Sequence, residues 1–220
     1  MKIIPTAKQI VNKRKGIIMK KADKTKLTKQ RILKAAVEEF GTYGYDGATV
    51  NHICSRHNIS KGLIYHNFEN KGALYLVCVE TAVDEFIAYM SEFQFGTDFH
   101  KYMEERYKFF HKNQKFAHLI FSATPTSEDK DFTNALQNIR KRFDAFNAQL
   151  YLSALDSLHL RAGVTKDDAL QYYGLLQDML NSYTSINGGT DGFKIALDNR
   201  EKNLYKILDY MLYGIAEVQK

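Results

Sequence analysis

The chain has 220 residues, of which 45% are hydrophobic, 25% are charged and only two are proline. It contains no long apolar run, which argues against a membrane protein, and its two cysteines without a secretion signal argue against a disulfide-stabilised secreted protein. We therefore expect a cytoplasmic globular protein. Residues 1–73 hold 15 Lys or Arg against 5 Asp or Glu, whereas residues 74–220 hold 16 against 20. A basic first third indicates nucleic acid as a partner.

Residues 1–25 form a lysine-rich N-terminal extension that leaves three interpretations open. It is a basic arm that binds a DNA groove or backbone, a short amphipathic helix, or the product of an upstream start with Met19 as the true first residue. The amphipathic interpretation follows from apolar pairs that recur every seven residues, at Ile3-Ile4, Ile10-Val11 and Ile17-Ile18. Charges separate these pairs, so the extension is neither a membrane span nor a signal peptide.

The segment at residues 29–40 predicts a helix with one apolar face. Ile32, Ala36 and Phe40 recur at every fourth residue and share that face, which can pack beneath neighbouring helices. Gly41 and Gly44 are expected to stop the helix.

Residues 49–71 predict two short helices joined by a tight turn. The Thr49 hydroxyl can cap the first helix, and Ser60 can cap the second. Between them, Asn58 is a residue that tolerates the left-handed conformation of a helix exit. This pattern is typical of a helix-turn-helix, whose second helix enters the major groove of DNA.

The second of these helices has two different sides. At about 100° per residue, Ile64 and Phe68 point into the domain, and the opposite side carries Gly62, Leu63, His66 and Asn67. Lys61 and Tyr65 flank the buried edge. Gly62 lowers helix stability by about 1 kcal/mol against Ala, which suggests that something must approach the backbone there.

The region from Arg31 to Tyr75 resembles the N-terminal domain of the TetR/AcrR family of bacterial transcriptional regulators. The residues that carry the resemblance are Ile32-Leu33, Ala35-Ala36, Phe40, Gly44-Tyr45, Thr49-Val50, Ile53, Ser60-Lys61-Gly62, Tyr65, Phe68, Lys71 and Leu74. With the cap residue Ser60 included, the resemblance gives these DNA-binding candidates: Thr49, Asn51, Ser60, Lys61, Gly62, Leu63, Tyr65, His66, Asn67 and Lys71. Leu63, Asn67, His52 and Asn58 depart from the family pattern, so no known operator is carried over.

The chemistry of these side chains divides their expected roles. Lys61, Lys71 and the Tyr65 phenol suit phosphate oxygens, which position a protein on DNA without reading sequence. Base readout is then expected from Leu63, His66, Asn67 and Asn51. Because an Asn side-chain amide can bond both N6 and N7 of adenine, a half-site containing A/T pairs is favoured.

Residues 74–220 predict further helices, so the fold class is all-α: an N-terminal helix-turn-helix domain at residues 26–73 and a larger helical domain at residues 74–220. Asn70 is expected to cap a long connecting helix. The other apolar-periodic segments lie at residues 98–113, 115–123, 129–161, 166–186 and 193–217. His100, Glu104, His111 and His118 would form a metal-binding stripe on one unbroken helix, but Asn113-Gln114 indicates a break, and no metal site is expected.

The last two helices have single-sided apolar patterns. In the resembling family such helices pair in a homodimer, and a two-fold dimer is also what a palindromic DNA site requires. The interface candidates are Leu170, Tyr173, Leu180, Leu204, Leu208, Met211 and Ile215. The alternative is that this stripe is a core face within one chain.

Aromatic residues are dense between Phe93 and Tyr183, and most of them are expected in the core. The resemblance implies an effector cavity in this region, and large apolar pockets with a few polar groups are what small molecules bind. The ligand-binding candidates are Tyr107, Phe110, Phe121, Arg142, Phe146 and Tyr173, with Arg106 as a further anchor for an anion.

No Gly-rich phosphate loop, nucleophile elbow or spaced carboxylate pair is present, so neither enzymatic activity nor a cofactor is expected. The sequence therefore predicts a DNA-binding transcriptional regulator, a repressor that leaves its palindromic operator when an apolar or aromatic effector binds the C-terminal domain. In the alternative, that domain binds a protein partner instead of a small molecule.

Overall fold

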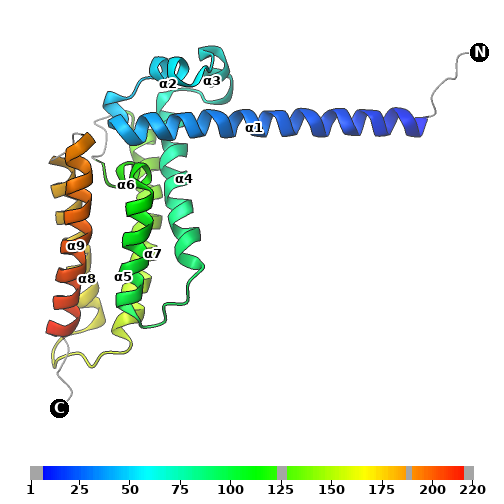
Figure 1. Cartoon of the computed structure of the whole chain (residues 1–220). Coiled ribbons are helices and arrows are strands. Elements are labelled where there is room, and N and C mark those ends of the chain that lie inside the picture. The colour runs from blue at the N-terminus through cyan, green and yellow to red at the C-terminus, as the bar shows by residue number, and fades with distance from the viewer. Residues whose placement is uncertain (1–6, 123–127, 187–189, 216–220) are drawn as a thin grey trace, which may run out of the picture.

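The computed structural model describes the backbone of residues 7–122, 128–186 and 190–215, and the side chains of residues 23–122, 128–179 and 197–213. This part of the chain folds into nine helices and contains no strand, as the all-α prediction requires (Figure 1). The helices are α1 (Ala7–Gly47), α2 (Val50–His57), α3 (Lys61–Asn67), α4 (Lys71–Ser91), α5 (Phe99–Lys112), α6 (Gln114–Phe121), α7 (Lys130–Leu155), α8 (Lys166–Ile186) and α9 (Thr190–Ile215). Within the described residues, no helix is both long and apolar enough to cross a membrane.

The helices form a head and a body that share α4. Figure 1 shows α2 and α3 lying against one side of α1, while the long helices α4, α5, α7, α8 and α9 run side by side as a bundle roughly perpendicular to it, with the short α6 at the end nearest α1. The first half of α1 projects clear of the rest of the molecule. The head therefore sits at one end of the bundle, where α2 and α3 face outward.

Several helix boundaries follow the sequence prediction, and others do not. Asn113 separates α5 from α6, as Asn113-Gln114 indicated. The expected end of the first helix at Gly41 is wrong, because α1 continues through Gly41 and only Gly44 leaves helical geometry, with φ 69° and ψ −176°. A segment expected at residues 129–161 ends earlier, since α7 stops at Leu155 and Asp156 is its C-cap.

An aromatic cluster joins the head to the body. The ring of Tyr75 on α4 lies 5.1 Å from Phe40 and 4.9 Å from Tyr45, both on α1, between ring centroids. Phe132 on α7 completes the cluster at 5.2 Å from Tyr45. Buried aromatic pairs at these separations add to the stabilisation that comes from the area they remove from water. Rotation of the head would break these contacts.

A second junction holds α1 directly against α6. The His118 ring donates from Nδ1 to the Gly41 carbonyl oxygen at 2.9 Å, and Lys115 forms an ion pair with Glu38. The helices come so close that a Cβ atom at Gly41 would lie 2.5 Å from the Lys115 Cβ and 3.0 Å from its Cα. Only a residue without a side chain fits there.

We predict that Gly41→Ala lowers the free energy of unfolding by about 1–3 kcal/mol, because α1 must move away from α6 to make room. Denaturant unfolding followed by circular dichroism measures the change. Gly174→Ala in α8 is the matched control, because open space surrounds Gly174 and the higher helix propensity of Ala should stabilise the fold by about 1 kcal/mol. The same response from both variants would contradict a tight α1–α6 contact.

Candidate DNA-binding site

The turn between α2 and α3 is built by the three residues that the sequence singled out. The Thr49 hydroxyl accepts a hydrogen bond from the His52 amide at 3.1 Å, and the Ser60 hydroxyl accepts one from the Leu63 amide at 3.2 Å. Between them, Asn58 adopts a left-handed conformation with φ 51°. The predicted caps and helix exit are confirmed.

Helix α1 fixes the position of α2 through charged side chains that the sequence analysis missed. The Glu39 carboxylate, only 1% exposed, lies 3.1 Å from the His52 ring nitrogen Nδ1 and 3.4 Å from an Arg56 nitrogen. Arg31 donates to the carbonyl oxygens of His57 at 3.1 Å and Asn58 at 2.8 Å, at the end of α2. A glutamate directly before Phe40 in an apolar stripe was the available signal, because a buried carboxylate needs partners.

The outer side of α3 is available to a partner. Ile64 is buried at 1% exposure, whereas Lys61, Gly62 and His66 are exposed, as predicted. Tyr65 is 44% exposed. The DNA-contact candidates outside α3 that are exposed are Thr49, Asn51 and Ser60.

Two of the expected base-reading residues are less accessible than the rest. Leu63 is half-buried against the core, and Asn67 is also half-buried. The Asn67 side-chain amide donates to the Leu63 carbonyl oxygen at 2.8 Å, so its nitrogen already closes the last turn of α3. Among the four base-reading candidates, His66 and Asn51 are therefore the exposed ones.

The two lysines expected at phosphates both lie over aromatic rings. The Lys71 Nζ lies 4.4 Å from the centroid of Tyr45, and the Lys61 Nζ lies 6.0 Å from that of Tyr65. Lys71 is half-buried, and this burial lowers its pKa. Such rings orient an ammonium group without neutralising its charge, so both cations stay available to an anion.

Most of the effector-binding candidates are packing residues in the body. Phe110, Phe121 and Tyr173 are 0%, 3% and 5% exposed and belong to one continuous core. Tyr107 and Phe146 are half-buried. Arg142 lies on the surface, where it pairs with Glu80 at 3.3 Å and Asp84 at 2.5 Å. The structure does not gather these six side chains around one cavity.

A buried charge network crosses the body between α5 and α9. Arg106, 1% exposed, donates from Nε to the Glu201 carboxylate at 2.9 Å, and Arg200 donates to the same carboxylate at 2.6 Å. Burial alone would lower the pKa of Arg106, but Glu201 outweighs it and raises that pKa. Burial lowers the pKa of Arg200 to about 10. Both arginines therefore remain charged at neutral pH and share one carboxylate.

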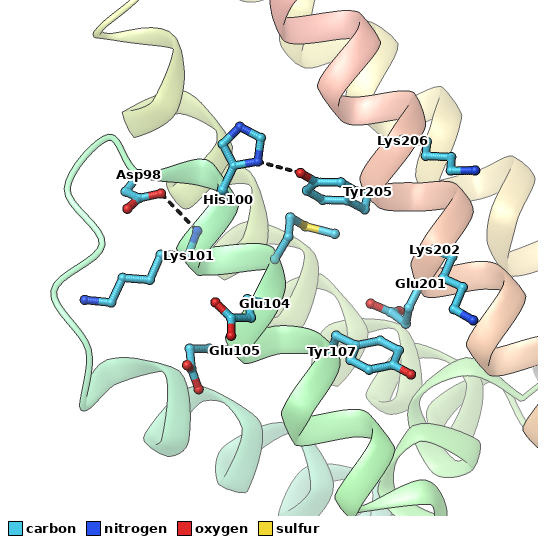
Figure 2. Close-up of a pocket in the computed structure, with 11 residues that line it drawn as sticks. Asp98, His100, Lys101, Glu104, Glu105, Tyr107, Glu201, Lys202, Tyr205 and Lys206 are labelled. Atoms are coloured by element: carbon cyan, nitrogen blue, oxygen red, sulfur yellow. Dashed lines mark hydrogen bonds between the residues drawn. The ribbon is translucent and has the colours of Figure 1, made fainter.

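An open groove of about 920 Å³ lies on the surface above this network. Figure 2 shows its two walls, α5 and α9, with Tyr107, Glu201 and Tyr205 between them. His100 closes one end through hydrogen-bond contacts with the hydroxyls of Tyr205 at 2.6 Å and Tyr213 at 3.2 Å. Of the predicted ligand-binding residues, only Tyr107 lines this groove.

The expected dimer stripe divides into buried, half-buried and undescribed residues. Tyr173, Leu204 and Leu208 are at most 5% exposed within the single chain, and Leu170 and Met211 are half-buried. The side chains of Leu180 and Ile215 lie outside the described residues. The large apolar side chains of α8 and α9 that are described and exposed are Tyr172, Leu175, Met179, Tyr210 and Tyr213. Because Tyr213 contacts His100 of α5, we call the other four the apolar patch.

Gly62 gives a direct test of the outer side of α3, because no atom lies within 4 Å of a Cβ placed there. We predict that Gly62→Ala leaves the fold intact and stabilises it by up to about 1 kcal/mol, yet weakens duplex binding by at least about tenfold. Unfolding and fluorescence anisotropy with labelled DNA measure the two effects. Gly174→Ala should match the gain in stability without loss of affinity. Undiminished affinity of Gly62→Ala would show that nothing approaches this backbone.

Comparison with known proteins places the head in a family. Residues 32–78 match the family model described as bacterial regulatory proteins, tetR family. The chain is 34% identical over 62 residues to the biofilm operon regulator IcaR of Staphylococcus epidermidis, and the match covers 28% of this chain and 34% of that protein. It is 42% identical over 60 residues to the repressor AcnR of Corynebacterium jeikeium, and this match covers 26% of this chain and 32% of that protein. The matches thus span about a third of these relatives.

Solved structures extend the likeness to the whole fold. FadR of Bacillus subtilis, in complex with stearoyl-CoA, has a TM-score of 0.60 at 15% identity, covering 84% of this chain and 98% of that one. FadR of Bacillus halodurans has a TM-score of 0.59 at 15% identity, and the match covers 86% of this chain and 96% of that one. The head matches by sequence, and the helical arrangement matches by shape. Residues 32–78 are thus similar to the tetR family of bacterial regulatory proteins, and the chain as a whole shares the fold of these solved structures.

Proposed function

We propose that the protein is a cytoplasmic transcriptional repressor that binds a palindromic operator and leaves it when a small molecule binds the body. The observation that carries this proposal is the exposed outer side of α3 on a basic head, fixed in place by α1. The ammonium groups of Lys61 and Lys71 suit phosphates, and exposed His66 and Asn51 suit base edges.

A homodimer supplies the second recognition helix. One short helix reads few base pairs, whereas a two-fold dimer reads two half-sites spaced by the helical repeat. The apolar patch on α8 and α9 is the surface that supports this pairing, because four large apolar side chains on adjacent helices are more than isolated exposure explains. It replaces the buried stripe of Tyr173, Leu204 and Leu208 as the proposed interface.

The groove between α5 and α9 is the proposed effector site. Met103, Tyr107 and Tyr205 give it apolar and aromatic surface, and Lys101, Lys202 and Lys206 add positive charge. Three of its acidic residues are already engaged: Glu201 by two arginines, and Glu104 and Glu105 by Lys108. An apolar or aromatic molecule with an acidic group fits this combination, and a structural neighbour was solved with stearoyl-CoA.

A chain of contacts connects this groove to the head. Arg200, which shares Glu201 with Arg106, lies 3.8 Å from the centroid of the Phe121 ring at the end of α6. The same short helix holds α1 through Lys115 and His118. A ligand that draws Glu201 or Arg200 away would thus move α6 and, with it, the head. By linkage, such a ligand must prefer the conformation with lower DNA affinity.

The alternative is that the body binds a protein partner instead of a small molecule. The filled aromatic core and the apolar patch favour it, because large exposed apolar patches mark protein interfaces. A second copy of the chain accounts for the same patch and also supplies the second head, so we place the homodimer first.

Selection of bound duplexes from a random pool tests the DNA-binding proposal. We expect a palindrome with half-sites one helical turn, or a multiple of it, apart. On the selected duplex, Lys61→Ala should weaken binding to all sequences and reduce the salt slope by about 1. His66→Ala or Asn51→Ala should instead relax one base position at a cost of about 1–3 kcal/mol. Recovery of no preferred sequence would refute operator recognition.

An effector screen separates the sensor from the partner-binding alternative. We expect long-chain or aromatic carboxylates and acyl thioesters to raise the melting temperature and to release the selected duplex. Tyr107→Ala, in the groove, should abolish both effects while DNA binding persists without the compound. If a compound acts equally on both proteins, the groove is not the site; if no compound acts, the partner-binding alternative stands.

A further inference from the structure

The first half of α1 is a long, strongly basic helix that contacts little of the molecule. Residues 7–31 contain ten Lys or Arg and a single Asp. The helix is continuous from Ala7 to the kink at Gly44, and its first buried side chain among those described is Ile32. Figure 1 shows this segment projecting past α2 and α3 into open space. We call residues 7–31 the basic helix.

A helix of this composition is unstable when nothing packs against it or neutralises its charge. Helices in proteins gain most of their stability from packing, and like charges four residues apart, such as Lys20 and Lys24, repel each other. Lys24, Lys26 and Lys29 are exposed, and no described residue forms an ion pair with them. These three lysines therefore have no counter-charge among the described residues.

Its direction is set by the helix-turn-helix. Arg31 bonds the end of α2, and Glu39, about two turns further along the same helix, holds His52 and Arg56. Because the basic helix continues this rigid support, it leaves the head at a fixed angle to α3. Figure 1 shows the basic helix running past α2 and α3 and continuing beyond them.

We propose that the basic helix binds the phosphate backbone of the DNA that flanks the operator half-site. At about 1.5 Å per residue it spans roughly 37 Å, the length of about eleven base pairs. Phosphate contacts carry no sequence information, so the helix would extend the bound length of DNA without extending the sequence read. This inference rests on the proposed function of α3.

Charge favours DNA over the other possible partners. A second copy of the same helix would bring together two chains of strong positive charge, which repel each other. An anionic membrane would need a continuous apolar face; the apolar pairs Ile10-Val11 and Ile17-Ile18 share one face of the helix, but Arg14 and Lys21 fall on that same face and interrupt it. A duplex offers closely spaced negative charge and requires no apolar surface.

The test compares two duplexes that share one operator, recovered by selection with the full chain. One ends at the edges of the palindrome, and the other carries about twelve extra base pairs of arbitrary sequence on each side. We expect the full chain to bind the longer duplex about tenfold more tightly at low salt, with a salt dependence that is steeper by about 0.9 per neutralised phosphate.

Two double variants, matched in the charge they remove, show which lysines produce the tighter binding to the longer duplex. Lys13→Gln with Lys20→Gln should lose most of the flank-dependent gain and keep its affinity for the short duplex. Lys141→Gln with Lys166→Gln removes the same charge from the body and should keep the gain; the exposed ion pair of Lys166 with Asp156 contributes little to stability.

Equal affinity for both duplexes, or a flank gain that survives Lys13→Gln with Lys20→Gln, would overturn the proposal. So would binding to anionic phospholipid vesicles that the longer duplex fails to displace. If selection recovers no operator at all, the proposed function itself fails, which distinguishes the two failures.

Discussion

The structure depends on a single helix that serves two surfaces. One face of α1 packs on α4 and α6, where Gly41 permits contact with Lys115 and the His118 ring bonds the backbone. Another face holds α2 through Arg31 and Glu39. Because the same rigid element touches both, α3 can change its position on the body only if the aromatic cluster around Tyr75 and the α1–α6 contact also change.

The sequence predicted the elements whose determinants are local. The caps Thr49 and Ser60 and the left-handed Asn58 each depend on residues within a few positions, and all three are present. The inward Ile64 and the break at Asn113 follow from local periodicity as well. By contrast, α1 continues through Gly41 because packing against α6 outweighs the low helix propensity of glycine, and no local pattern reveals that contact.

The body shows why the candidate pocket and interface were harder to predict. Aromatic density cannot distinguish a cavity from a filled core, and Phe110, Phe121 and Tyr173 pack in the core. The apolar stripe of Leu204 and Leu208 is buried within the chain, while Tyr172 and Tyr210 remain outside. Apolar side chains lie on more than one side of α8 and α9, and the packing of neighbouring helices decides which side is buried. The groove joins residues about a hundred positions apart, such as His100 and Tyr205.

The central claim is that two copies of α3 read one duplex from the same side. Hydroxyl-radical and methylation footprinting on a selected operator tests it most directly. Two protected major-groove segments, related by a two-fold axis and separated by whole helical turns, are the expected result. A single protected segment, or protection on opposite sides of the duplex, would contradict a dimeric helix-turn-helix regulator.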